Sequence, residues 1–318
     1  MRAARIHRFG PPEAIELDEV QRPEPGADEV LVRVAAAGVG PWDALIREKK
    51  SAVSVPLPLT LGSDIAGVVE QVGSGVRGLS PGDEVYGATN PQFIGGYAEY
   101  AAVQAGMIAR KPRSLSFEEA ASAPVIAVTA WQMLFDYAKA RAGQSVLIHG
   151  AAGNVGAYAV QMARRAGLHI FATAAGADEN FVRGLGAETV VDYRSTRFED
   201  VVPRVDIVLD MVGGETRQRS FGVIAPGGIL VSVVSNEPSG NDVPGGVRSV
   251  FFLVDVTTER LERLTELFDA GELKARVGTV LPLEEARRAH EMLGGAPHEP
   301  GKIVLRMSGG DQAAKREM

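Results

Sequence analysis

Cysteine is absent from all 318 residues, so disulfides and thiolate metal sites are both excluded. No stretch approaches the roughly 18 consecutive apolar residues of a membrane-spanning helix. The basic start, residues 1–8, is not followed by the apolar run of a secretory signal. An excess of positive charge is also missing, since the net charge is -7, which argues against a nucleic-acid partner. We therefore expect a cytoplasmic protein that enters no membrane and binds no nucleic acid.

The chain is long enough for two domains, and its 45% hydrophobic and 23% charged residues are ordinary for a globular protein. Its first 120 residues or so read as short strands separated by glycine and proline. Strands are predicted at residues 30–34, 65–72 and 97–103, and a turn at 81–85 opens another. This pattern of short strands and turns is typical of a barrel-like β domain.

After residue 116 the pattern changes to helices and then to regular alternation. Helices are predicted at 116–123, 127–140, 259–269 and 283–293, and a last strand at 302–306. Between them, apolar strands are predicted at 145–151, 168–174, 188–193, 205–212, 227–234 and 250–254. Helices that begin near Val155, Glu179 and Thr216 separate these strands. Such alternation predicts an α/β domain with a parallel, doubly wound sheet.

One segment of this domain carries a recognisable motif. Residues 145–156 run from an apolar strand through a glycine-rich turn into a helix. A dinucleotide pyrophosphate needs backbone N–H groups at a helix N-terminus and a turn without obstructing side chains. Here Gly153 would let the backbone approach the phosphates and Gly156 would let the helix pack on the strand. The predicted pyrophosphate-binding residues are Ala151, Ala152, Gly153, Asn154, Val155 and Gly156.

The end of the second strand bears on the choice of cofactor. An NAD-dependent enzyme usually has an acidic residue there to bind the ribose hydroxyls. In this chain residues 173–177 are small and uncharged, which leaves room for a 2′-phosphate, although Asp178 and Glu179 follow directly. We therefore expect NADPH, with NADH as the less favoured cofactor, and we place Thr173 and Ala174 in the site.

Several further motifs, in order along the chain, resemble those of one family. They lie at residues 62–69, 81–85, 96–100, 128–131, 185–188, 191–193 and 301–305. With the nucleotide turn, the chain resembles the zinc-independent members of the medium-chain dehydrogenase/reductase superfamily, in the quinone oxidoreductase (zeta-crystallin-like) group. The resemblance implies a GroES-like, β-rich catalytic domain from residues 1–123 and 258–318. It implies a Rossmann dinucleotide-binding domain at 124–257.

The same resemblance implies further cofactor contacts and a homodimer. It places one group of residues near the nicotinamide, namely Thr129, Phe251, Phe252 and Leu253. It places others along the rest of the cofactor, namely Tyr193, Val212, Val234, Ser235 and Lys302. The dimer would form through the edge strand near residues 251–254.

The zinc ligands of related dehydrogenases have no counterparts here. By resemblance, Ser63 stands where zinc-containing relatives have a histidine, and Asp64 follows it. With no cysteine in the chain, the resemblance implies no metal site, and both residues become candidates for the catalytic site instead.

The acceptor side also departs from the pattern of quinone reductases. Gly40 stands where these relatives often have asparagine, and Leu45 where they often have tyrosine, while Asp43 matches. Trp42 adds an indole, so we predict an apolar pocket for a flat aromatic or hydrophobic acceptor. The alternatives are that Trp42 is a core residue and that Asp43 is a structural anchor.

These observations predict hydride transfer from NADPH to a quinone or similar carbonyl acceptor, with Trp42, Asp43, Ser63, Asp64 and Thr129 as the catalytic candidates. A quinone needs no strong general acid, because solvent can protonate the reduced oxygens. A second hypothesis is reduction of a 2-alkenal or enoyl C=C bond, with Tyr86 or Tyr97 as proton donor. A third is a nucleotide-binding sensor or crystallin-like protein with little turnover. We interpret His149, just before the turn, as a strand residue facing a neighbouring helix.

Overall fold

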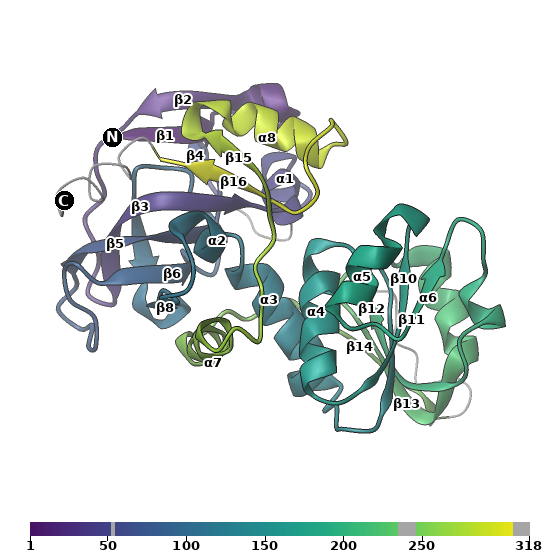
Figure 1. The fold of residues 1–318 in the computed structure, drawn as a ribbon. Helices are drawn as coiled ribbons and strands as arrows, with labels where there is room; N and C mark the ends of the chain where they lie inside the picture. Colours follow the sequence, from purple (N-terminus) through teal and green to yellow (C-terminus); the bar gives the residue numbers. More distant parts are fainter. Residues whose placement is uncertain (52–54, 235–245, 308–318) are drawn as a thin grey trace. The chain divides into compact units, whose positions relative to one another are not determined.

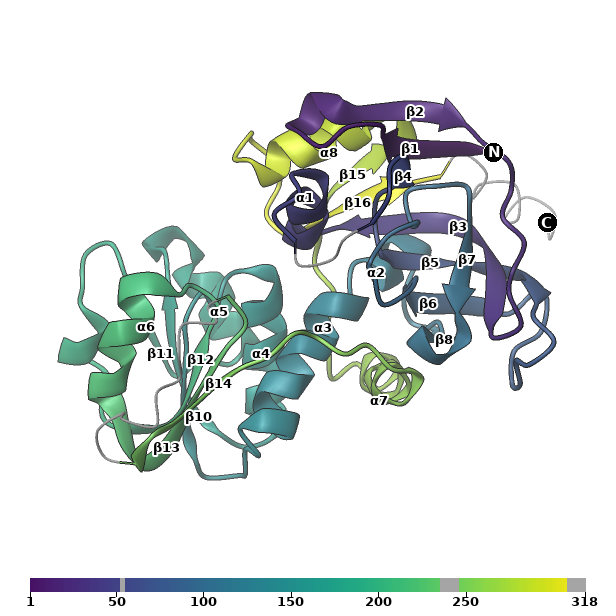
Figure 2. The same cartoon turned by 180° about the vertical axis from the view of Figure 1, so that it is seen from behind.

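The computed structural model describes residues 1–51, 55–234 and 246–307 of the chain. The chain divides into two compact units, one formed by Met1–Val125 with Val256–Met318 and the other by Ile126–Asp255. Figure 1 shows both units, and Figure 2 shows them from behind. The first unit thus contains both ends of the chain, and the second is a single continuous segment.

The first unit is built mainly from antiparallel strands. Its larger sheet has seven strands in the order β15-β16-β3-β5-β6-β8, with β7 also paired to β3, and its smaller sheet has the order β2-β1-β4. The bounds are β1 Arg2–Ile6, β2 Ile15–Glu19, β3 Glu29–Val39, β4 Leu59–Thr60, β5 Asp64–Val72, β6 Glu84–Ala88, β7 Tyr100–Gln104, β8 Ile108–Arg110, β15 Val277–Pro282 and β16 Lys302–Arg306.

The last strand of the chain completes the larger sheet. β16 pairs antiparallel with β3, and Val304 lies opposite Gly38. Both strands are almost wholly buried, since they contribute to one apolar core with residues from β1 and from the C-terminal helix. Burial of apolar surface on this scale is the main favourable contribution to the stability of the unit.

Four α-helices accompany these sheets: α1 Pro41–Arg47, α2 Phe117–Ala121, α7 Thr258–Asp269 and α8 Ala286–Leu293. The predicted N-cap of α2 is confirmed, because Ser116 Oγ accepts a hydrogen bond from Glu119 N–H at 3.2 Å. The predicted helix 283–293 begins with a short 3-10 helix, Leu283–Glu285, before α8. Two further short 3-10 helices lie at Pro12–Ala14 and Ala105–Met107. In the described part of the chain, no helix has the length and apolar character to cross a membrane.

The second unit contains the predicted parallel sheet. Its strands are β9 Ser145–Ile148, β10 His169–Ala174, β11 Thr189–Asp192, β12 Val205–Asp210, β13 Ile224–Ser232 and β14 Arg248–Phe251. They pair in the order β11-β10-β9-β12-β13-β14, which is the order 3-2-1-4-5-6 of dinucleotide-binding folds. The fold class predicted from the alternation of strands and helices is therefore confirmed.

In this unit the helices α4 Asn154–Arg165, α5 Glu179–Leu185 and α6 Gly214–Ser220 connect the parallel strands. The helix α3 Pro124–Trp131 starts in the first unit and precedes the sheet. Short 3-10 helices occupy Gly176–Asp178, Phe198–Asp200 and Phe221–Val223, and a π-helix occupies Gln132–Tyr137. Because α4 follows β9 directly, the predicted glycine-rich turn lies at the carboxyl end of the sheet, beside the point where the strand order reverses.

Two boundaries differ from the prediction for physical reasons. Residues 127–140 do not form one α-helix, since α3 begins earlier, at Pro124, and passes into the π-helix. Proline is compatible with the first turn of a helix because that turn needs no N–H donor. The predicted strand 250–254 ends at Phe251, where pairing with Ser232 of β13 stops.

Candidate functional site

The glycine-rich turn joins β9 to α4 in five residues. β9 is fixed by apolar burial, since Val146, Leu147 and Ile148 are all fully buried. Gly150 then adopts a positive φ of 70°, a conformation that L side chains rarely adopt. Gly153 is the N-cap of α4 with φ -74° and ψ 172°. The chain therefore reverses at Gly150 and enters the helix at Gly153.

Gly156 is needed for a different reason, which is close approach. A Cβ at this position would lie 2.3 Å from Gly150 O and 2.7 Å from Ala151 Cα, so any side chain would push the helix away from the turn. At Gly153 a Cβ would meet only Gly150 O, at 3.2 Å, and this residue is exposed. The roles expected from the sequence, packing for Gly156 and open backbone for Gly153, agree with these surroundings.

The turn presents N–H groups that suit an anion. Gly153 N–H donates to Gly150 O at 3.0 Å, and Ala157 N–H makes a helical bond to Gly153 O at 2.9 Å. The N–H groups of Asn154, Val155 and Gly156 therefore precede the hydrogen-bond ladder of α4. Together with the helix dipole, they fit the pyrophosphate of a dinucleotide.

The ends of two neighbouring strands lie against this turn. Ala151 N–H donates to Thr173 O at the end of β10, at 3.1 Å. On the other side, a Cβ at Gly150 would lie 3.5 Å from a methyl group of Val212, which follows β12 and is 53% exposed. The structure thus brings Thr173 and Val212 to the predicted turn.

The ribose end of the predicted site is formed by the ends of β10 and β11. Tyr193 is exposed, and its N–H donates to Ala174 O at 3.2 Å, so these two predicted residues are joined. Glu179 pairs with Arg183 at 2.8 Å. Asp192, which the sequence analysis did not assign to the site, lies next to this end, because a Cβ at Gly176 would lie 2.8 Å from its carboxylate. Its position at the end of a predicted strand was the available signal.

The residues expected near the nicotinamide lie on other elements of the second unit. Thr129 is buried in α3, while Phe251 ends β14 and Leu253 is 74% exposed. Phe252 stacks on Tyr137 of the π-helix at 4.3 Å between ring centroids.

The segment after β14 makes a second contact with the π-helix Gln132–Tyr137, in which Asp255 N–H donates to Gln132 Oε1 at 2.9 Å. Val234, beyond β13, is 51% exposed, and the predicted residue Ser235 lies outside the described residues.

In the first unit, four of the predicted residues form one cluster. Trp42 Nε1 donates to Ser63 Oγ at 2.9 Å. Lys302 Nζ pairs with Asp64 Oδ2 at 3.0 Å and lies 4.3 Å from the centroid of the Trp42 ring. Both charged side chains are buried. The structure therefore places Lys302, which the resemblance assigned to the cofactor, inside the cluster around Trp42.

Burial governs the electrostatics of this cluster. It raises the pKa of Asp64, while the Lys302 ammonium and the Val125 N–H, which donates to Asp64 Oδ1 at 3.0 Å, lower it. Burial likewise raises the pKa of Asp43 to about 7. Asp43 Oδ2 accepts hydrogen bonds from Gly40 N–H and the Tyr97 hydroxyl, both at 2.8 Å. Both bonds are internal to the first unit, as expected if Asp43 is the structural anchor that the sequence suggested as an alternative.

Gly40 and Trp42 fit one another closely. A Cβ at position 40 would lie 2.3–2.5 Å from three atoms of the indole, so only glycine leaves room for the ring in this position. The replacement at Gly40 and the added indole of Trp42 are thus one structural feature, whereas the other departure, Leu45, lies outside this fit.

The two tyrosines considered as proton donors are both fully buried. The Tyr86 hydroxyl donates to Leu261 O at 2.7 Å, and the Tyr97 hydroxyl donates to Asp43. Each hydroxyl proton is therefore committed to a hydrogen bond inside the first unit.

The donor set around Ser63 does not suit zinc. Ser63 offers a neutral hydroxyl that already accepts from Trp42, and the Asp64 carboxylate is neutralised by Lys302. Among the described residues, a group with metal-binding side chains close together lies elsewhere, at His7, Glu16 and Asp18. Asp18 there already pairs with Arg5.

The chain matches two families of known proteins. Residues 26–113 match the alcohol dehydrogenase GroES-like domain family, and residues 185–305 match the zinc-binding dehydrogenase family. The chain is 33% identical to the quinone oxidoreductase of Mus musculus over 96% of this chain and 97% of that protein. It is 35% identical to the 2-methylene-furan-3-one reductase of Solanum lycopersicum, over 86% of this chain and 70% of that one.

A solved structure extends the similarity to three dimensions. The structure of Escherichia coli quinone oxidoreductase complexed with NADPH superimposes with a TM-score of 0.86 at 27% identity, covering 96% of this chain and all of the other. With 96% of the chain covered, the similarity extends over both units. The chain therefore belongs to the quinone oxidoreductase group of the medium-chain dehydrogenase/reductase superfamily, and it is an oxidoreductase with a nicotinamide cofactor.

Proposed function

We propose that this protein is an NADPH-dependent, zinc-independent reductase of quinones or similar hydrophobic carbonyl acceptors. The observation that carries the proposal is the glycine turn between β9 and α4, in a chain that resembles a quinone oxidoreductase over 96% of its length. We assign cofactor binding to the Rossmann domain, residues 124–257, and acceptor binding to the GroES-like domain.

In this proposal the backbone of residues 151–156 binds the pyrophosphate, and Thr173, Ala174 and Tyr193 flank the adenosine. Val212, Val234 and residues 251–253 line the rest of the cofactor, with Thr129. When bound, the reduced nicotinamide supplies the hydride. The protein orients the two reactants and excludes water from the reaction.

The preference for NADPH rests on the end of β10. Residues 173–177 carry no charge, and the Glu179 carboxylate is paired with Arg183. We assign the 2′-phosphate to the exposed guanidinium of Arg194, because this residue directly follows Tyr193, whose N–H donates to Ala174 O at the end of β10. The carboxylate of Asp192 would repel a 2′-phosphate at this end of the site. Asp192 is therefore the residue to examine if NADH binds more tightly than NADPH.

The proposed binding site for the acceptor is built around Trp42 and its neighbours. We assign the indole to the wall of an apolar acceptor pocket, with Ser63 and Lys302 holding the ring in place. Asp43 and Asp64 support this wall from buried positions. A quinone suits such a site because solvent can protonate the reduced oxygens, so no tyrosine has to be released from its hydrogen bond.

Zinc independence follows from the donor set. Zinc in dehydrogenases is held by thiolate, imidazole or carboxylate ligands. Position 63 offers only a hydroxyl, and the neighbouring carboxylate is occupied by an ammonium group. The proposed reaction therefore uses Ser63 and Asp64 to position Trp42 and Lys302 rather than to hold a metal.

A second candidate is reduction of an activated C=C bond, which the similarity to the tomato 2-methylene-furan-3-one reductase favours. A proton would then have to reach the substrate carbon. Because Tyr86 and Tyr97 are both committed to buried acceptors, this reaction would have to draw its proton from solvent.

A titration separates these possibilities. The purified protein is titrated with NADPH and with NADH while nicotinamide fluorescence is followed, and 1,4-benzoquinone or a 2-alkenal is then added. We expect tighter binding of NADPH and faster oxidation with the quinone. Faster oxidation with the alkenal would favour the second candidate, and absence of binding would contradict the site itself.

We further propose that the protein is a cytoplasmic homodimer that associates through β14. This strand ends the order of the parallel sheet, and Leu253 beside it is 74% exposed. Light scattering after gel filtration tests the dimer, and a monomer at micromolar concentration would contradict it.

A further inference from the structure

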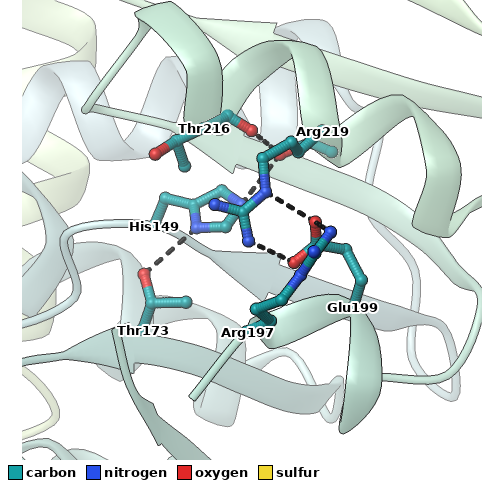
Figure 3. A network of polar contacts seen from close by, with 7 residues as sticks. His149, Thr173, Arg197, Glu199, Thr216 and Arg219 are labelled. Atoms are coloured by element: carbon teal, nitrogen blue, oxygen red, sulfur yellow. Dashed lines mark hydrogen bonds and ion pairs between the residues drawn. The ribbon is translucent and has the colours of Figure 1, made fainter. Parts of the chain in front are cut away.

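His149 is a buried histidine between the nucleotide turn and α6. It follows β9 directly, and its backbone N–H donates to Leu209 O of β12 at 3.0 Å. Its ring lies 3.1 Å from Thr173 Oγ1 through Nδ1 and 2.9 Å from Ser220 Oγ through Nε2. Figure 3 shows the ring between Thr173 and the helix that carries Thr216 and Arg219.

The direction of each hydrogen bond follows from its partners. Ser220 Oγ lies 2.7 Å from Thr216 O, which can only accept, so the serine hydroxyl donates there. It must then accept from His149, which places the ring proton on Nε2. Nδ1 is left with a lone pair and accepts from the Thr173 hydroxyl.

The chain of bonds continues into the nucleotide turn. Gly150 N–H donates to the remaining lone pair of Thr173 Oγ1, at 3.4 Å. The relay therefore runs from Gly150 through Thr173 and His149 to Ser220 on α6, with one donor and one acceptor at every step. Gly150 is the residue at φ 70° where the turn reverses.

The far side of His149 is fixed by a second set of contacts. The ring packs edge-on against Phe198 at 4.8 Å between centroids. Arg219, next to Ser220, donates through Nε to Glu199 at 2.6 Å, and Glu199 also pairs with Arg197 (Figure 3). These contacts hold the end of α6, and with it the Ser220 hydroxyl, against the ring.

We propose that His149 is a positioning residue for the cofactor: through Thr173 it fixes the Gly150 N–H and so holds the turn in the conformation that receives the pyrophosphate. This inference rests on the proposed function. Without the relay the Gly150 N–H loses its acceptor and the turn is held by fewer hydrogen bonds, so part of the binding free energy is spent on ordering the turn again. Burial lowers the pKa of His149 to about 4, which keeps the ring neutral and the lone pair on Nδ1 available.

A matched pair of variants at position 173 tests the relay. Thr173→Val keeps the shape of the side chain and removes the hydroxyl, whereas Thr173→Ser keeps the hydroxyl and removes the methyl group. We expect the Kd for NADPH, measured by fluorescence, to rise about tenfold in Thr173→Val and to change less than about twofold in Thr173→Ser. Equal Kd values for Thr173→Val and wild type would overturn the proposal, as would equal losses in the two variants.

A variant at the other end separates positioning from direct contact. Ser220 lies on α6, and Ser220→Ala removes the acceptor for Nε2–H together with the hydrogen bond that the serine hydroxyl donates to Thr216 O. We expect the Kd for NADPH to rise at least about threefold. The double variant Thr173→Val/Ser220→Ala should bind no more weakly than Thr173→Val alone, because both changes break one relay. Fully additive losses would mean that the two residues act independently, against the proposal.

The relay itself is tested without cofactor. Nitrogen NMR identifies the protonated ring nitrogen of His149, with His149→Gln giving the assignment, and hydrogen exchange measures protection of the Gly150 amide. We expect the proton on Nε2, and faster Gly150 exchange in Thr173→Val than in wild type or Thr173→Ser. A proton on Nδ1, or unchanged exchange, would overturn the relay. If these results hold but no nicotinamide binds, the proposed function has failed and the relay has not.

Discussion

At the scale of single residues, Gly153 is the position where a substitution tests the nucleotide turn most directly. Its φ of -74° is open to any L residue, and it is the N-cap of α4, where aspartate and asparagine are favoured. A side chain there can therefore change the charge of the turn while the fold is kept. Gly150 and Gly156 offer no such access, because one has a positive φ and the other packs against backbone.

Gly153→Asp should abolish NADPH binding, with a rise in Kd of at least about a hundredfold from repulsion between carboxylate and pyrophosphate. Gly153→Asn has the same size without the charge, so it adds the obstruction but not the repulsion and should lose less affinity than Gly153→Asp. Fluorescence titration measures both Kd values, and thermal unfolding should show that neither variant loses stability. Equal affinity of Gly153→Asp and wild type would remove the turn from the site.

Gly40 and Trp42 should behave as a coupled pair. Gly40→Ala places a methyl group 2.3 Å from the indole and should cost about 1–3 kcal/mol of unfolding free energy. In a Trp42→Ala background the same change should cost much less, which denaturant unfolding of the four proteins measures.

The same variants also report on the acceptor. Trp42→Ala should change the ratio of quinone to alkenal turnover more than it changes the Kd for NADPH. If neither quantity moves, Trp42 is a packing residue, which is the alternative considered from the sequence.

At the scale of elements, α1 starts at a buried carboxylate whose ionisation is unfavourable. Asp43 bonds the N–H of Gly40 at the beginning of the helix, and Asp43 Oδ1 is buried with no partner among the described residues. Its pKa is raised from 3.8 to about 7, mainly by burial. The folded state therefore holds this proton more tightly than the unfolded state, and the associated stability is lost as the pH rises from about 4 through 7.

Asp43→Asn removes this titration and keeps an oxygen for Gly40 and Tyr97. Relative to wild type, its unfolding free energy should increase between pH 4 and pH 7, by roughly 4 kcal/mol at most. Denaturant unfolding at several pH values measures the difference, with Asp28→Asn, at an exposed position, as the control. A difference that is constant with pH, or that falls as the pH rises, would contradict the burial of a proton at Asp43.

Elements and their order were predictable from the sequence, but their ends were not. Apolar β-branched runs separated by helical stretches predicted the parallel sheet that the structure has. Pairing decides where a strand stops, so β14 ends at Phe251 opposite Ser232 although the apolar run continues. The π-helix after Trp131 depends on contacts such as Tyr137 with Phe252, which no local pattern encodes.

The same distinction holds for the candidate site. The glycine spacing predicted the turn, and His149 was predicted to face a neighbouring helix, which Ser220 of α6 confirms. The burial of Lys302 beside Asp64 joins residues distant in the chain, and it depends on how β16 returns to β3, which residue spacing alone does not specify. The fit of Gly40 to Trp42 is local, but the sequence does not show that the indole packs against the glycine backbone.

At the scale of the whole molecule, one chain combines a glycine-rich turn in the second unit with a buried cluster of a hydroxyl, an indole and an ion pair in the first. The first unit has two sheets and the second has one, and each unit has its own apolar core. The function proposed here needs both: the turn to bind NADPH, and the cluster around Trp42 to accept a quinone without metal.

The most direct test of this account is the initial rate of NADPH oxidation with 9,10-phenanthrenequinone, using protein dialysed against a chelator and shown to be free of zinc. We expect the metal-free protein to keep its full rate, and added zinc not to raise it. Loss of the quinone-dependent rate on chelation, with recovery on addition of zinc, would show that the enzyme depends on zinc.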